Sequence, residues 1–367
     1  ADVSLGCTGT SETNTITFKP FTGVTCSLVF SSTATTSIDG HFVIGSPNAT
    51  NTNLVSTNYV TIDGSNAVNG TSKDLTITGA NTGTQKSVIR IFGNNDFITV
   101  KNCIITSNST SGNSTAPIQI TNYNVSFTNY TPDNITVQNN TLTSQGGNGS
   151  QGVFIGNSGT PTVGITNMVV SNNTITARAT RVISFNYVND GSIFNNTITH
   201  NNSAAPTGSA SIVLLTGTPN AGTYNIYNNN FISLQVSNTG TGASNGLIAI
   251  DNQLTTPKIV NIYNNVIRGI TFTSASVSNS KIYGIRHTSS STSNIYNNSI
   301  YFPDMTNMTT FGSSFIAGIV FASTGENSPA TGATCTVKNN SIFIDESSMK
   351  VYAIRRGGTV GTFTSDN

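Results

Sequence analysis

One phrase recurs along the chain and constrains its fold more than any other feature. An apolar-alternating strand runs into Asn-Asn and continues as a second alternating strand, as in ITVQNNTLTS (135–144), YNIYNNNFIS (224–233) and SNIYNNSIYF (293–302). The second position of the pair is Cys103 in an early copy and an asparagine in the later ones, namely Asn140, Asn173, Asn196, Asn229, Asn265, Asn298 and Asn340. Repeats separated by 20 to 50 residues are typical of solenoids, propellers and arrays, in which each unit buries its apolar face against its neighbours.

The spacing of the copies favours a solenoid. Asn173 and Asn196 lie only 23 residues apart, whereas Asn298 and Asn340 are 42 apart. A four-stranded propeller blade needs a longer and steadier interval, while a coil of three short strands fits the short one and loops fill the long ones. A second series of alternating strands, including GLIAIDN (246–252) and AGIVFAS (317–323), lies between the copies.

The sequence therefore predicts an all-β fold, a single-stranded right-handed parallel β-helix of about ten coils. We expect one domain over residues 1–367, with irregular N-terminal coils over 1–56 and regular Asn-Asn repeats over 57–367. Alternating Ile, Val, Leu and Phe fill the cylinder, and parallel backbone hydrogen bonds join coils about 4.8 Å apart.

The recurrent asparagines are interpreted as structural. Asparagine tolerates the left-handed backbone conformation of a sharp turn, and stacked amides can form a hydrogen-bonded ladder. Several asparagines that begin the pair lie in Asn-x-Ser/Thr sequons but are expected to turn into the coil, namely Asn139, Asn172, Asn195, Asn297 and Asn339. The sequons outside the pair are better candidates for a glycan, namely Asn48, Asn113, Asn129, Asn148 and Asn307.

Charge and hydropathy limit the location of the protein and its partners. Charged residues make up 8% of the chain and the formal net charge is +1, so no broad attraction to nucleic acid or anionic membranes is expected. No apolar run approaches the ~20 residues that span a bilayer. The chain opens at Ala1, which is interpreted as a mature N-terminus after signal-peptide removal or as a trimmed chain. Both interpretations agree with an extracellular, secreted or cell-surface protein.

The four cysteines fall into two groups. Cys7 and Cys26 are candidates for a disulfide near the N-terminus. Cys103 and Cys335 lie about seven coils apart, roughly 30 Å along the stack at the strand spacing, which is too far for a disulfide. We expect both to be buried thiols.

No constellation of catalytic residues or metal ligands stands out. Glycosidases need paired carboxylates, yet only 14 acidic residues occur and no Asp-Asp pair is present. The three histidines lack metal-ligand spacing, so neither a metal nor another cofactor is expected.

One polar cluster provides weak catalytic candidates. Asp251 and Arg286 occupy the same position in successive coils, with His287 beside them, and Arg355 and Arg356 return to that position two coils later. A surface salt bridge with solvated arginines is the preferred interpretation. A small anionic-sugar site with Arg286 as base, or a contact surface for another subunit, is the alternative.

An aromatic column provides a binding hypothesis. Phe194, Tyr227, Tyr263 and Tyr296 precede the Asn pair in four successive coils, and alternation places them outside. Stacking on the sheet alone explains such a column, and an exposed strip of this kind can also bind a partner or a glycan.

The I-x-x-NN-x-I phrase resembles the right-handed parallel β-helix repeat proteins, a group that includes the pectate-lyase-like folds. Phrases such as NYVTIDGSN (58–66) and GTVGTFTSDN (358–367) resemble large secreted surface proteins of bacteria that use type IX secretion. This resemblance covers nearly the whole chain and implies surface display, adhesion or fibre building.

Three functions follow as hypotheses. The preferred one is a non-catalytic extracellular structural or adhesive protein that self-associates end to end in a filament or continues into a longer chain. The alternatives are a lyase or hydrolase acting on an acidic polysaccharide and a passive glycan-binding module.

Overall fold

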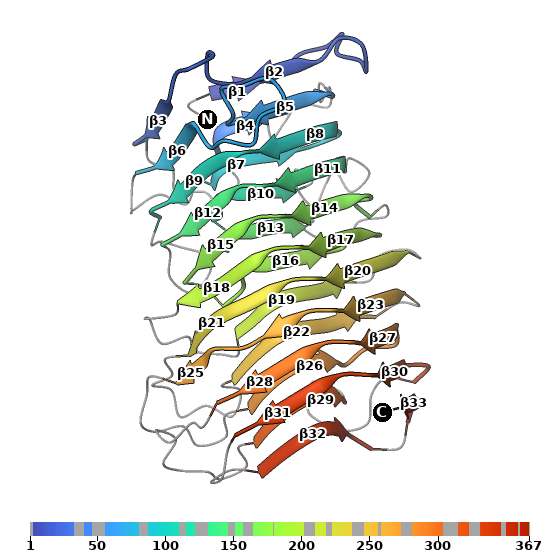
Figure 1. Cartoon of the computed structure of the whole chain (residues 1–367). Coiled ribbons are helices and arrows are strands. Elements are labelled where there is room, and N and C mark those ends of the chain that lie inside the picture. The colour runs from blue at the N-terminus through green and yellow to red at the C-terminus, as the bar shows by residue number, and fades with distance from the viewer. Residues whose placement is uncertain are drawn as a thin grey trace.

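A computed structural model gives the fold of the chain (Figure 1). It describes residues 3–32, 40–45, 56–80, 87–109, 115–121, 131–145, 151–156, 164–178, 180–201, 210–217, 222–236, 246–255, 258–272, 281–303, 315–322, 331–345, 350–358 and 360–366. The described residues form short parallel strands stacked in three sheets, A, B and C, and no helix. The fold is the predicted parallel β-helix.

Each sheet takes one strand from every coil. Sheet A contains β1 (Val3–Leu5), β4 (Gly40–Ile44), β7 (Ser87–Phe92), β10 (Ile118–Thr121), β13 (Val153–Gly156), β16 (Ile183–Asn186), β19 (Ala210–Gly217), β22 (Gly246–Leu254), β26 (Lys281–His287), β29 (Phe315–Phe321) and β32 (Lys350–Arg356).

Sheet B contains β2 (Ile16–Phe18), β5 (Val60–Asp63), β8 (Asp96–Lys101), β11 (Asp133–Gln138), β14 (Met168–Ser171), β17 (Gly191–Phe194), β20 (Thr223–Tyr227), β23 (Ile259–Tyr263), β27 (Thr292–Tyr296), β30 (Thr334–Lys338) and β33 (Thr362–Asp366).

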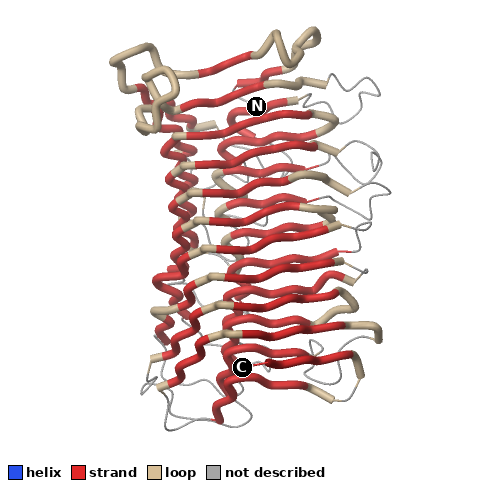
Figure 2. Tube along the Cα trace, turned by 45° about the vertical axis from the view of Figure 1, so that its right-hand side comes forward, coloured by secondary structure: helices blue, strands red, loops and turns tan. Residues whose placement is uncertain are grey.

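Sheet C contains β3 (Cys26–Phe30), β6 (Leu75–Gly79), β9 (Cys103–Ser107), β12 (Thr141–Ser144), β15 (Thr174–Ala177), β18 (Thr197–Asn201), β21 (Asn230–Val236), β24 (Val266–Ile267), β28 (Ser299–Phe302) and β31 (Ser341–Ile344), and β25 (Ile270–Phe272) pairs with β21. The strands lie one above another along the rod (Figure 2). Strands β1 to β4, from the N-terminal segment, take part in the same three sheets.

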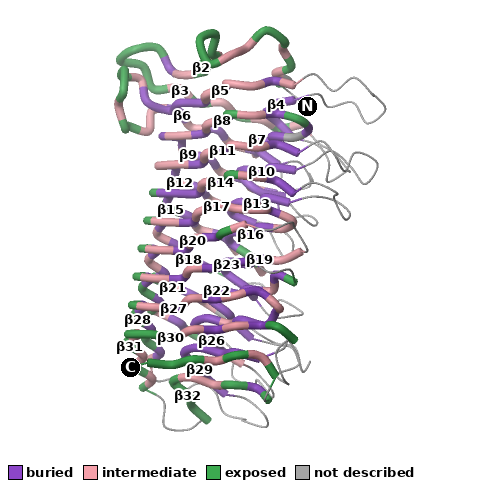
Figure 3. Tube along the Cα trace, turned by 90° about the vertical axis from the view of Figure 1, so that its right-hand side faces the viewer, coloured by how far each residue is buried: buried purple, intermediate pink, exposed green. Residues whose placement is uncertain are grey.

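The core runs through the middle of the stack. Strands β11, β20 and β27 alternate between buried and partly exposed residues, so every second side chain points inward. One continuous cluster of inward Ile, Val, Leu and Phe extends from Phe42 to Val337 (Figure 3). Each coil contributes only a few apolar side chains, so its stability depends on the coils above and below it.

The two asparagines of the pair have different structural roles. The first takes a left-handed backbone conformation, with φ between 51° and 59°, at Asn102, Asn139, Asn172, Asn195, Asn228, Asn264, Asn297 and Asn339. The second is buried at Asn140, Asn173, Asn196, Asn229, Asn265 and Asn298. The left-handed residue turns the chain from sheet B into sheet C and resets the inward–outward alternation.

The buried asparagines are hydrogen-bonded from coil to coil. The Asn196 backbone N–H donates to Asn229 Oδ1 at 3.1 Å, and Asn196 Nδ2 donates to the same oxygen at 3.0 Å. Asn229 Nδ2 donates to the Ile193 carbonyl at 2.8 Å and to Asn265 Oδ1 at 3.0 Å. The same bonds recur from Asn140 to Asn340, so each amide satisfies backbone groups that the turn would leave unpaired.

The sequons at the corner do not lie as expected. Asn172, Asn195, Asn297 and Asn339 are exposed and Asn139 is half-buried, although the sequence predicted that they turn into the coil. The left-handed conformation points the first side chain of the pair outward and the second one inward. The five other sequon asparagines, Asn48, Asn113, Asn129, Asn148 and Asn307, lie outside the described residues.

The cysteines are separate thiols. The disulfide expected between Cys7 and Cys26 is not formed. Cys7 follows β1 of sheet A, whereas Cys26 begins β3 of sheet C and packs against the core, so the two lie on different sides of the coil. Cys103 and Cys335 are fully buried thiols as predicted, and burial raises the pKa of each to about 12.

A search of the described residues finds no helix that is long and apolar enough to cross a membrane.

Candidate ligand-binding face on sheet B

The outer side of sheet B carries regular columns of outward side chains, which we call the sheet-B face. In the column at the carboxyl ends of the strands, consecutive register partners are Asp63, Lys101, Gln138, Ser171, Phe194, Tyr227, Tyr263, Tyr296, Lys338 and Asp366. The predicted aromatic residues are therefore one stretch of a longer column. Parallel pairing in register brings residues far apart in the sequence side by side at the strand spacing.

The aromatic residues form a ladder, defined as Phe194, Tyr227, Tyr263 and Tyr296. Ring centroids of successive members are 4.8, 4.9 and 4.9 Å apart, and their planes lie within 5° of parallel. Each contact of this kind contributes about 0.5–1.5 kcal/mol beyond area burial. Because the rings cover one another's faces, the inner members of the ladder present ring edges and phenol oxygens to solvent. Partial burial and the neighbouring phenols raise the pKa of Tyr263, so its hydroxyl remains protonated at neutral pH.

A second ladder of amides runs beside the aromatic one. Asn261 Nδ2 donates to Asn225 Oδ1 at 3.0 Å, and Asn294 Nδ2 donates to Asn261 Oδ1 at 2.9 Å. Asn225, Asn261 and Asn294 occupy the outward position two residues before Tyr227, Tyr263 and Tyr296. These side chains are half-buried, so each amide retains hydrogen-bonding capacity toward solvent.

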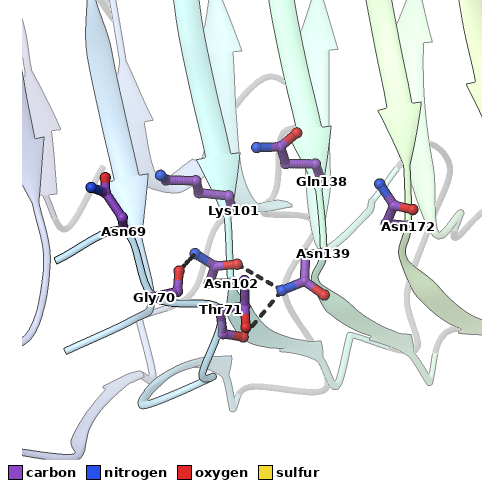
Figure 4. A pocket seen from close by; sticks show the side chains of 8 residues that line it. All are labelled: Asn69, Gly70, Thr71, Lys101, Asn102, Gln138, Asn139 and Asn172. Atoms are coloured by element: carbon purple, nitrogen blue, oxygen red, sulfur yellow. Dashed lines mark hydrogen bonds between the residues drawn. The ribbon is translucent and has the colours of Figure 1, made fainter. Parts of the chain in front are cut away.

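Nearer the N-terminus the column leads into an open cavity of about 630 Å³, which we call the amide trough. It is lined by Asn69, Gly70, Thr71, Lys101, Asn102, Gln138, Asn139 and Asn172. Figure 4 shows Lys101 and Gln138 on neighbouring strands above Asn102 and Asn139. The trough is therefore lined mainly by amide groups, which can both donate and accept hydrogen bonds.

Hydrogen bonds fix the base of the amide trough. Asn139 Nδ2 donates to Asn102 Oδ1 at 2.7 Å and to the Thr71 carbonyl at 3.1 Å. Asn102 Nδ2 donates to the Gly70 carbonyl at 3.2 Å (Figure 4). It also donates to Asp63 Oδ1 at 2.7 Å. These contacts hold the side chains in place before any ligand binds, which lowers the entropic cost of binding.

The sequence analysis missed the amide trough. Lys101 and Gln138 stand directly before their Asn pairs, as Tyr227 and Tyr263 do, so the shared position was a usable signal. The other side of the trough comes from Asn69, Gly70 and Thr71, in a connection between β5 and β6. No periodic pattern places such a connection.

The weak catalytic candidates Asp251 and Arg286 form a buried ion pair rather than the expected surface one. They are register partners on the outer side of sheet A. Arg286 Nε and Nη2 donate to the two oxygens of Asp251 at 2.9 and 2.7 Å, and the Asp251 side chain is fully buried. Ser211 Oγ and Gln253 Nε2 also donate to Asp251. Because both carboxylate oxygens are occupied and the guanidinium retains its proton, this pair holds the sheet and supplies no base.

His287 does not lie beside that pair. It points into the coil, where Asn252 Nδ2 contacts its Nδ1 at 3.0 Å and Ser293 Oγ contacts the same atom at 2.6 Å. Burial lowers the pKa of His287 to about 4, so the imidazole is neutral at physiological pH. Adjacent strand residues face opposite sides, which separates His287 from Arg286.

Arg355 and Arg356 likewise contact different parts of the protein. Arg355 shares the outward column of Arg286, and its guanidinium lies 4.2 Å from the Phe315 ring centre. Arg356 is the register partner of Phe321 and donates from Nη2 to the Gly361 carbonyl at 3.1 Å. Neither lies on the sheet-B face.

Within the described residues no group of three or more His, Cys, Asp or Glu side chains is placed to hold a metal ion.

No family model and no curated protein matches the chain. Among solved structures, the A-module of the mannuronan C-5 epimerase AlgE6 from Azotobacter vinelandii is similar, with a TM-score of 0.41 and 12% sequence identity. The match covers 97% of this chain and 92% of that one.

Proposed function

We propose that this β-helix is a non-catalytic, extracellular adhesive protein that binds a polysaccharide along the sheet-B face. The observation that carries the proposal is the column of register partners in which the buried Ser171 lies between Gln138 of the amide trough and Phe194 of the aromatic ladder. Long and regular columns of hydrogen-bonding side chains on a sheet suit an extended polymer better than a compact ligand.

The chemistry of the side chains on the sheet-B face supports a sugar ligand. Phenol hydroxyls and amides can each donate and accept hydrogen bonds, as the hydroxyls of a sugar require. Both ladders repeat once per coil, so successive sugar units meet equivalent groups. Ligand sites of this kind combine aromatic surface with a few oriented polar groups.

The structure offers little support for the enzyme alternative. The one acid–base pair that the sequence singled out, Asp251 and Arg286, is buried and saturated with hydrogen bonds. His287 faces the core. A binding role needs neither of them.

Export, cell-surface display and a type IX secretion context belong to the same proposal and rest on the sequence resemblance. End-to-end association, or continuation into a longer chain, stays a prediction. Inward apolar side chains of the first and last coils, among them Leu28, Phe30 and Ile342, are only partly buried, as at an end that meets further coils. Electron microscopy of the purified protein over a range of concentrations tests this, since regular fibres support association and isolated rods at every concentration contradict it.

The binding test is affinity electrophoresis in gels that contain polysaccharides, with Tyr263→Ala as the first variant. Removing the central ring breaks both stacking contacts of Tyr263, and we expect retardation by a bound polysaccharide to fall at least about ten-fold, which corresponds to ~1.4 kcal/mol. Tyr301→Ala is the matched control, because Tyr301 is an exposed aromatic residue stacked on Phe343 in sheet C. Equal retardation of both variants would place binding elsewhere and refute the assignment of this face.

A further inference from the structure

Each of the two lysines in the column at the carboxyl ends of sheet B has an aspartate as a register partner. Lys101 Nζ lies 3.3 Å from Asp63 Oδ2, so the lysine of the amide trough is already paired. Lys338 has Asp366 as its register partner at the other end of the column. Asp190 lies outside this column, just before the amino end of β17, and its Oδ1 accepts a hydrogen bond from the Asn167 backbone.

Further carboxylates lie at the amino ends of β8 and β11, on the opposite edge of sheet B from the column and two to three coils before Phe194. Asp96 Oδ1 accepts from Asn134 Nδ2 at 2.7 Å, and Asp133 accepts from both the backbone and the hydroxyl of Thr166. The described strands of sheet B contain no arginine, the residue best suited to bind carboxylate or sulfate groups. Arg286 and Arg355 lie on sheet A.

Resting on the proposed function, we infer that the ligand is a neutral, hydroxyl-rich polysaccharide and not a uronate or sulfated one. A polyanion would meet the carboxylates of Asp96 and Asp133 at the edge of the face and no arginine on the described strands of sheet B, and like charges at close approach repel. Amides and phenols, in contrast, hydrogen-bond to uncharged hydroxyls without a net charge on either side.

The ladder geometry gives the orientation and the contacts of this ligand. The columns run across the strands, so an extended chain that follows them lies along the rod axis. Because the rings of Tyr227, Tyr263 and Tyr296 stack face to face at 4.9 Å, their faces are largely covered. The phenol hydroxyls and the amides of the neighbouring column therefore make the recognition contacts.

This geometry provides a variant that preserves the fold. In the triple variant Tyr227→Phe, Tyr263→Phe and Tyr296→Phe, the stacked rings remain, and Phe194 shows that the ladder accepts phenylalanine. Only the hydroxyls are lost. We expect at least about a ten-fold loss of affinity for a neutral polysaccharide, since several hydrogen bonds to the ligand are removed. Tyr301→Phe on sheet C is the matched control and should bind as the unaltered protein does.

The experiment compares soluble β-glucan, xylan and mannan with alginate, polygalacturonate and a sulfated galactan, at low and high NaCl. We expect at least one neutral polymer to bind with little dependence on salt, and the triple Phe variant to lose that binding. If an acidic polymer binds instead, weakens with salt and is lost in the triple variant, the neutral assignment is wrong while the binding face stands. If no polymer binds, or if the triple variant binds as before, the proposed function of this face fails as well.

Discussion

The Asn-Asn pair divides two tasks between neighbouring residues of the same type. The first asparagine accepts a φ near +55°, and the second satisfies backbone groups of the adjacent coils. Asparagine suits both tasks, because it tolerates the left-handed region and its amide both donates and accepts. Only the second task requires burial, so the two residues should respond differently to substitution.

We predict that Asn229→Ala destabilises the protein by about 3 kcal/mol. The substitution removes the acceptor of the Asn196 N–H and the donor to the Ile193 carbonyl, both buried. Buried polar groups that lose their partner cost ~1–3 kcal/mol each. Urea unfolding followed by circular dichroism measures the effect.

The control for this prediction is Asn225→Ala, in the half-buried outer amide ladder. Water can replace its bond to Asn261, so we expect a loss below ~1 kcal/mol. Similar losses at Asn225 and Asn229 would show that the inner ladder has no special role in stability.

The buried His287 predicts a pH dependence of stability. Its pKa falls from 6.5 in the unfolded chain to about 4 in the folded one. Between these values the unfolded state binds more protons, so the free energy of unfolding rises with pH. The contribution is complete above pH 6.5 and is lost as pH falls to 4, a change on the order of 3 kcal/mol.

Denaturation midpoints measured from pH 4 to 7 check this prediction. In His287→Asn, which carries no titrating group there, the slope over this range should be smaller than in the unaltered protein. Parallel curves for the two proteins would mean that other groups cause the pH dependence.

The sequence analysis assigned the second asparagine of each pair to a ladder, but it also turned the first one into the coil, although that side chain points outward. The inward–outward alternation of the strand before the pair does not predict which side chains point inward after it, because the residue with positive φ interrupts the alternation. Residues 286 and 287 were grouped for a different reason, because the comparison of columns ignored that neighbouring residues of a strand face opposite sides.

At the level of elements, sheet C has an irregularity where one coil contributes two short strands, β24 and β25, instead of one. Both pair with β21, and Gly269 lies between them with φ +70°. A Cβ at Gly269 would lie 2.2 Å from the Ile232 carbonyl oxygen. The residue therefore needs both a left-handed backbone and close approach to the adjacent coil.

We predict that Gly269→Ala destabilises the protein by more than the ~1–2 kcal/mol of an ordinary left-handed alanine. The added methyl group must push β24–β25 away from β21 and weaken the pairing on both sides. Gly332→Ala provides the comparison, since Gly332 has φ +84° and no atom within 4 Å of the added Cβ. Thermal unfolding of both variants separates the two effects, and equal shifts would show that the close contact is unimportant.

The strands themselves were predictable, because period-two alternation survives wherever a strand has one buried face. The outer side of sheet A was not. There Ile248, Tyr283, Phe315 and Val320 form a second buried hydrophobic cluster, so β22, β26 and β29 are buried on both faces. A sequence interpretation that assumes one core assigns such residues to the surface, which explains why the Asp251–Arg286 pair was expected to be exposed.

For the whole molecule, contacts link each coil mainly to the coil above and the coil below. Every strand of the three sheets pairs with the strands of neighbouring coils, and one core extends along the stack. Stability in such an array is approximately a sum over coils and their interfaces, so interior coils have two interfaces and terminal ones have one. Core-facing residues of the end coils, Leu28 and Ile342 among them, are only partly buried, which reduces the burial there further.

We therefore predict a gradient of hydrogen exchange along the rod. Backbone amides of β14, β17, β20 and β23 should exchange slowest, because opening them disrupts two interfaces of the stack. Amides of β2, β3, β32 and β33 should exchange faster, with intermediate rates between. Hydrogen–deuterium exchange read by mass spectrometry resolves these segments, and a uniform rate along the chain would show that the rod opens as one cooperative unit. Exchange repeated with a bound polysaccharide would slow the amides of sheet B more than those of sheet C in the same coils if the ligand lies where we place it.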